Sequence, residues 1–165
     1  MSRNLRISKL IAGAFVALLA MAGLALAAAP EQTRESYVAQ VEPICKTNTK
    51  ANERILAGAR KEVKEGELKV AAGQFTRAAA AFGKTVKLIA AVPRPSADSA
   101  KLAQWIGHLE AEQKLLSEIA KALKAGKKGR VQTLDVQLNN NSNITNNTVI
   151  EFGFNYCLIK QSRFS

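Results

Sequence analysis

The strongest constraint on the fold is a regular apolar repeat in the middle of the chain. Alternating steps of four and three residues mark the face that a helix buries when it packs in a bundle. Seven apolar residues follow this spacing: Leu68, Ala72, Phe75, Ala79, Phe82, Val86 and Ile89. The repeat predicts one long bundle helix, and a helix with such a face must pack against partners.

An earlier helix is predicted from Thr33 to about Lys64. Thr33 can cap its start, and Gly66 is expected to end it. Pro43 lies within this run and has no backbone N–H to donate. We therefore expect it to kink the helix, or to break it near residues 39–42.

A third helix is predicted after Pro93-Arg94-Pro95, because this stretch cannot continue a helix. Its start is expected at Ser96 or Asp98. Its apolar face comprises Leu102, Trp105, Ile106, Leu109, Leu116, Ile119 and Leu123.

The fourth segment is ambiguous. Residues 131–138 keep the helical spacing of apolar residues, but the asparagine-rich stretch 139–148 follows them. Asparagine is a poor helix former because its side chain competes for backbone hydrogen bonds. Two alternatives remain open: a strained or frayed helix through 139–148, or a helix that ends near Asn139 and is followed by a loop or short strand. Gly153 is expected to break the helix in either case.

Two cysteines, Cys45 and Cys157, allow one intramolecular disulfide. They are too few for a structural zinc site and too far apart in sequence for a Cys-x-x-Cys redox motif. Four helical segments of similar length with short connections predict an up-down-up-down bundle, in which the chain end returns beside the first helix. The sequence therefore predicts an all-α bundle of about four helices, clipped by a Cys45–Cys157 disulfide.

The N-terminal residues 1–27 have the features of a secretory signal peptide. Arg3, Arg6 and Lys9 precede an uncharged run, and Ala25-Leu26-Ala27 offers a small-x-small cleavage site. The alternative is an uncleaved membrane anchor. We expect cleavage, a single mature domain over residues 28–165, no later transmembrane segment, and a secreted or extracytoplasmic location in which the cysteines oxidise.

The set of chemically active residues is small, and we expect a non-enzymatic protein without metal or cofactor. His108 is the only histidine, and both methionines, Met1 and Met21, lie in the predicted signal peptide. These residues cannot supply the Glu-x-x-His pairs of a di-iron bundle or the axial ligands of a haem. Glu110 and Glu112 fall on different helix faces, so we interpret both as solvated surface charges.

The surface is expected to be strongly basic, because the chain carries a formal net charge of +11. Such a surface can bind anionic cell-wall polymers or lipid headgroups, or it can serve solubility alone. Nucleic acid is an unlikely partner, because no aromatic residues are interleaved with the basic run to stack on bases. The candidate anion-binding residues are Lys69, Arg77, Lys84, Lys87, Lys121, Lys124, Lys127, Lys128 and Arg130. A different hypothesis is a small-molecule carrier, with a ligand between the helices near Trp105, Phe75 and Phe82.

Three stretches carry a resemblance to a known group of proteins: YVAQVEPICK at 37–46, LAQWIGHL at 102–109 and FGFNYC at 152–157. Together with the signal-like N-terminus, they resemble small exported α-helical proteins of actinobacteria. The resemblance implies a helical fold and export. It supplies no catalytic residues.

Overall fold

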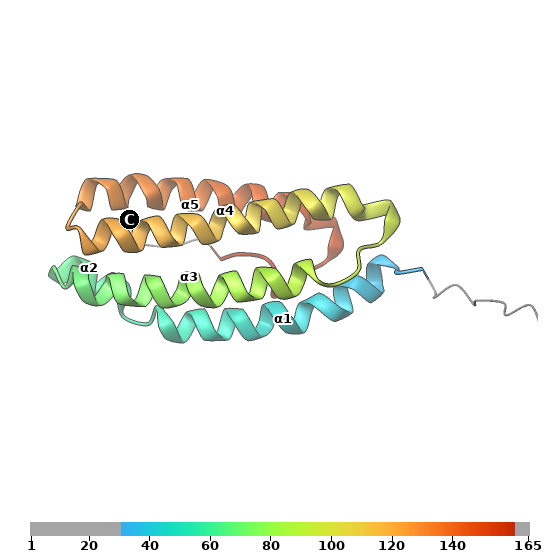
Figure 1. The fold of residues 1–165 in the computed structure, drawn as a ribbon, viewed down its shortest axis with the longest axis horizontal. Helices are drawn as coiled ribbons and strands as arrows, with labels where there is room; N and C mark the ends of the chain where they lie inside the picture. Colours follow the sequence, from blue (N-terminus) through green and yellow to red (C-terminus); the bar gives the residue numbers. More distant parts are fainter. Residues whose placement is uncertain (1–30, 161–165) are drawn as a thin grey trace, which may run out of the picture.

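The computed structural model describes residues 31–160 as an all-α, up-down bundle. Its long helices run side by side and alternate in direction (Figure 1). They are α1 (Arg34–Ile55), α3 (Leu68–Ala90), α4 (Ser99–Lys124) and α5 (Lys128–Thr148), with a short α2 (Ala59–Glu65) and the 3₁₀ turns η1 (Ser96–Asp98) and η2 (Ile150–Phe152). The predicted fold class is confirmed. The predicted signal peptide, residues 1–27, lies outside the described residues.

The core lies along the two most regular apolar repeats. On α3, Phe75, Phe82 and Ile89 are buried, and on α4 Trp105 and Leu109 are buried as well. Fully burying a large apolar side chain contributes roughly 1.5–3 kcal/mol relative to leaving it exposed. These two faces therefore account for the packing of α3 against α4, while α1 packs on α3 and α5 packs on α4.

The first helix differs from the prediction, because it stops at Ile55 instead of continuing to about Lys64. It passes through Pro43 without a break. Proline removes a bond to the carbonyl four residues earlier, and that residue, Ala39, is exposed, where water can replace the bond. The chain breaks instead before α2, where Gly58 has a φ of 83° that favours glycine. Nε2 of the buried Gln74 donates to the Ala57 carbonyl at 2.9 Å, which stabilises the break.

The asparagine-rich stretch 139–148 is helical, so the alternative of a loop or strand after Asn139 is wrong. The helix ends at Thr148 and not at Gly153, which instead follows η2 with a φ of 68°. The reason that such a sequence stays helical lies in the bonds of its side chains to α4 and to the chain end, described below.

After η2, the chain turns back and runs between the two layers of helices (Figure 1). We call residues 153–160 the C-terminal strap. Its Phe154 ring stacks on Trp105 with centroids 5.3 Å apart. The predicted disulfide is confirmed: Cys157 of the strap is bonded to Cys45 of α1, with Cα atoms 5.0 Å apart. Oε1 of Glu42 on α1 accepts hydrogen bonds from the backbone N–H groups of Asn155 (2.8 Å) and Tyr156 (3.1 Å).

The strap lies between α1 and α5, where these two helices would otherwise pack directly against each other. Direct packing between α1 and α5 is sparse, whereas the other neighbouring pairs of long helices pack along their faces. The strap therefore forms part of the wall of the bundle, which shapes the site beneath it.

Within residues 31–160, no helix is both long and apolar enough to span a bilayer.

Candidate functional site

A cavity of about 250 Å³ lies beneath the C-terminal strap. Each long helix contributes to its wall, among them Asn48 from α1, Phe82 from α3, Trp105 from α4 and Leu138 from α5. Residues 156–160 of the strap complete it. For comparison, an apolar protein cavity of about 150 Å³ is large enough to hold benzene. The space is therefore sufficient for a small organic molecule.

Glu112 of α4 is the one buried carboxylic residue among those that line this cavity. Its side chain is buried, with an exposed fraction of 3%. The prediction of a solvated charge is therefore wrong for Glu112, although it holds for the exposed Glu110. The sequence did contain a signal: Glu112 follows Leu109 by three residues and precedes Leu116 by four. It therefore occupies a position of the apolar face of α4.

The buried carboxylate is held by the asparagine-rich helix. Oε1 of Glu112 accepts a hydrogen bond from Ser142 Oγ at 2.7 Å, and Oε2 accepts one from Asn141 Nδ2 at 2.6 Å. Asn141 Nδ2 also donates to the His108 carbonyl at 3.0 Å. Burial raises the pKa of Glu112, and the hydrogen bonds from Asn141 and Ser142 oppose this rise.

These contacts explain why 139–148 remains helical. Its buried polar residues, Ser142 and Thr145, continue the inward-facing side of α5. Thr145 Oγ1 donates to the Asn141 carbonyl. The single hydroxyl proton of Ser142 is shared between Glu112 and the Leu138 carbonyl, which lies 2.9 Å from Oγ. Facing them across the helix pair is Glu112. A polar face on one helix thus meets a polar residue on the other, and both are satisfied.

Three other polar atoms belong to residues that line the cavity. Nε1 of Trp105, Oδ1 of Asn48 and Oδ1 of Asn52 are buried and have no hydrogen-bond partner among the described residues. Leaving such a group unsatisfied costs about 1–3 kcal/mol. One donor and two acceptors are therefore left unsatisfied around the same cavity.

The strap is held over the cavity by polar contacts as well as by the disulfide. Asn146 of α5 accepts a hydrogen bond from the backbone N–H of Ile159 at 2.7 Å and donates one to its carbonyl at 2.9 Å. Thr49 of α1 donates to the Tyr156 carbonyl at 3.3 Å. Lys160 pairs with Glu53 at 3.0 Å. The strap is therefore attached to both helices that flank it.

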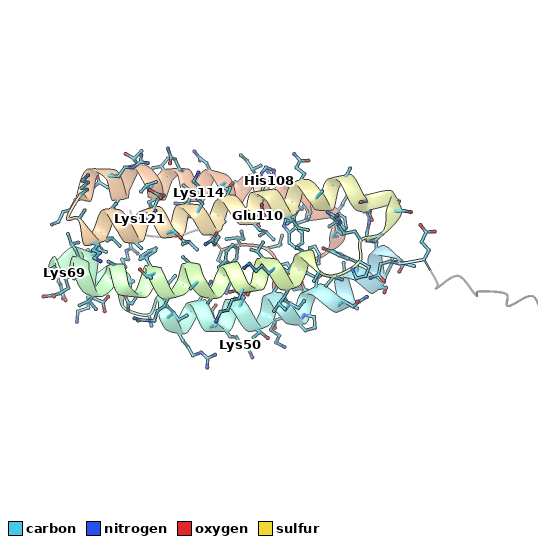
Figure 2. All side chains as sticks on the ribbon, viewed as in Figure 1. Lys50, Lys69, His108, Glu110, Lys114 and Lys121 are labelled. Atoms are coloured by element: carbon cyan, nitrogen blue, oxygen red, sulfur yellow. A yellow bond between two sulfur atoms is a disulfide. The ribbon has the colours of Figure 1, made fainter. Side chains whose placement is uncertain are left out.

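The predicted anion-binding cations lie elsewhere. All nine are exposed on the surface of the bundle, on α3, at the end of α4 and at the start of α5: Lys69, Arg77, Lys84, Lys87, Lys121, Lys124, Lys127, Lys128 and Arg130. Lys69 and Lys121 both lie toward the end of the bundle where α2 is found (Figure 2). By the helical rise, Lys87 lies about 27 Å along α3 from Lys69. The nine therefore form an end group and a separate stripe along α3.

Of the residues predicted to surround a small-molecule ligand, the structure brings Trp105 and Phe82 to the cavity wall. Phe75 is buried in the core and does not line the cavity. Among residues 31–160, no group of three or more His, Cys, Asp or Glu is placed to hold a metal ion. No protein-family model, curated protein or solved structure matches the chain.

Proposed function

We propose that this chain is an exported, non-enzymatic binding protein that holds one small, mainly apolar molecule beneath the C-terminal strap. The observation that carries the proposal is the cavity of about 250 Å³, with its apolar wall and its buried polar groups. Ligand sites are typically concave and apolar, with a few placed polar groups that orient the ligand. The export part of the proposal rests on the signal-like segment 1–27.

The chemistry of Glu112 supports binding over catalysis. Each of its carboxylate oxygens already accepts a hydrogen bond from α5. This arrangement fixes the carboxylate in one orientation, which suits the recognition of a ligand. A general acid or base must itself lie within hydrogen-bond reach of the proton that it transfers, whereas both carboxylate oxygens of Glu112 are already bonded to side chains of α5.

The experiment uses Trp105, the only tryptophan in the chain, as a reporter in the cavity wall. The purified oxidised protein is titrated with small aromatic and aliphatic compounds while its intrinsic fluorescence is recorded. We expect a saturable change in emission, together with a rise in the unfolding temperature at saturating ligand. Native mass spectrometry should show one bound molecule per chain.

A pair of threonine variants provides the control. Thr85 lines the cavity, whereas Thr76 is exposed on the same helix, and both hydroxyls donate to the carbonyl four residues earlier. We expect Thr85→Phe to fill the cavity and abolish binding, and Thr76→Phe to leave it intact. Folding of both variants is checked by circular dichroism. Equal binding by the two folded variants, or no saturable binding by the natural protein, would overturn the proposal.

A second candidate function is attachment to anionic cell-wall polymers or lipid headgroups. Its support is the exposure of all nine predicted cations, of which Lys121 is paired with Glu118 at 2.8 Å. Retention of the protein on an isolated cell-wall fraction or on anionic vesicles should then fall steeply with added salt. Lys127→Glu/Lys128→Glu should weaken retention more than Lys50→Glu, which reverses the charge of an exposed residue on α1 (Figure 2). Equal retention by both variants would exclude this function.

A further inference from the structure

The residues that line the cavity include one buried carboxyl group, that of Glu112. A carboxylate offers about four lone-pair positions, and Glu112 uses one on each oxygen for Ser142 and Asn141. A ligand that reaches this carboxylate could therefore donate further N–H or O–H hydrogen bonds to it. Oδ1 of Asn48 and Oδ1 of Asn52 also lack a donor, but both atoms are buried away from the open space.

The charge at the cavity favours a positively charged ligand. Within residues 31–160, Glu112 forms no ion pair, and its hydrogen bonds come from neutral side chains. The one cation that lines the cavity, Lys160, is paired with Glu53 and is 80% exposed, so it does not offset the buried carboxylate. Buried charges in proteins are generally paired. A cation supplied by the ligand would provide that pairing.

The apolar part of the wall also suits a cation on a small hydrophobic body. Trp105 and Phe82 line the cavity. Aromatic rings attract cations through their negative faces and bury apolar groups well.

We infer that the cavity takes a small organic cation, an ammonium group on a compact apolar body, with the ammonium against Glu112 and the body between Trp105 and Phe82. This inference rests on the proposed function and names its ligand class. Burial raises the pKa of Glu112 and so opposes its ionisation, whereas the bound cation favours the ionised carboxylate and lowers that pKa again.

Three probes with one carbon skeleton test the inference: phenethylamine, phenethyl alcohol and phenylacetate. Their affinities for the oxidised protein are measured at neutral pH by calorimetry and by Trp105 fluorescence. A hydrogen bond to a charged group changes affinity by about tenfold or more. We expect the amine to bind at least about tenfold more tightly than the alcohol, and phenylacetate to bind most weakly of the three.

Two glutamate variants on the same helix locate the effect. Glu112→Gln should weaken binding of the amine by about tenfold or more and leave the alcohol unchanged, because only the charged contact is lost. Glu110→Gln removes an exposed charge and should change neither. If the Gln variant does not fold, Glu112→Met removes the same charge and retains the bulk.

The outcomes separate this inference from the proposed function. Equal affinity for amine and alcohol, with no loss in Glu112→Gln, overturns the ammonium assignment and leaves an apolar binding site. Tightest binding of phenylacetate overturns it as well. If none of the three probes binds, the proposed ligand class is wrong. If the wider set of compounds described above also fails to bind, the proposed binding function is wrong as well.

Discussion

Removing the disulfide tests how far this fold depends on closure of its chain. The perturbation is Cys45→Ala/Cys157→Ala, which opens a loop whose ends are 112 residues apart in sequence. The loop-entropy relation gives a stabilisation of about 4.8 kcal/mol at about 25 °C for a loop of this length, mainly by restricting the unfolded chain. Stabilities of natural domains are about 5–15 kcal/mol, so we expect the variant to be only marginally folded.

The assay is equilibrium urea unfolding, followed by circular dichroism and by Trp105 fluorescence. Small domains have slopes of about 1–3 kcal/mol per molar urea, so the midpoint should fall by about 2 M or more. The slope should also increase, because the unfolded chain without the cross-link exposes more surface. Chemically reduced natural protein is the matched control and should behave like the double variant.

Two results would refute this reasoning. A loss of less than about 1 kcal/mol at an unchanged slope would show that loop closure contributes little to stability. Reactive thiols in the unfolded, non-reduced protein would show that Cys45 and Cys157 are not bonded.

Three further predictions concern buried polar groups. Burial raises the pKa of Glu112 above its ordinary value of 4.5, so the carboxyl group holds its proton more tightly in the native state than in the unfolded state. The contribution of Glu112 to stability therefore falls as the pH rises through the pKa of the folded state. The stability of Glu112→Gln relative to the natural protein should therefore increase from about pH 4 to pH 8, and a flat difference in urea midpoints would contradict this. Asn146→Ala removes two hydrogen bonds to Ile159 and should destabilise by about 1–3 kcal/mol and speed amide exchange in the strap, whereas Asn147→Ala at the adjacent exposed position should do neither. Burial raises the pKa of Tyr37 to about 12, and its hydroxyl has no hydrogen-bond partner among the described residues. Tyr37→Phe should therefore leave stability in thermal unfolding unchanged or raise it by about 1 kcal/mol. A clear loss of stability would show that the hydroxyl does make a hydrogen bond.

The parts of the fold that follow from local spacing were predictable from the sequence. The apolar faces of α3 and α4 repeat regularly, and the structure buries Phe82 and Trp105 on them as expected. The disulfide was predictable because two cysteines allow only one intramolecular pairing. The first prediction depends on near neighbours in sequence, and the second on the number of cysteines and on the up-down topology.

The break between α1 and α2 could not be predicted in this way. Pro43 was the stronger local signal, yet the helix passes through it. The break occurs at Gly58, where Gln74 from another helix donates to the freed carbonyl of Ala57. Tertiary contact here overrides the local preference.

The candidate site could not be predicted from local sequence either. The low helix propensity of asparagine disfavours a helix at 139–148, and the charge of a carboxylate disfavours its burial. Each feature taken alone therefore predicts the opposite of what the structure shows. Glu112 and Ser142 satisfy one another only when α4 and α5 are packed together. The spacing of Glu112 from Leu109 and Leu116 was the one sequence signal of this burial.

The contact of Glu112 with Asn141 and Ser142 also fixes the register of α4 against α5. Sliding α5 by one turn, about 5.4 Å, in the direction that brings Leu138 opposite the carboxylate would leave the charge without hydrogen bonds. Apolar side chains alone would tolerate such a slip far better, because leucine faces leucine in several alignments. A single polar layer thus disfavours this slip of the two helices, and with it a change in the level at which the chain end binds.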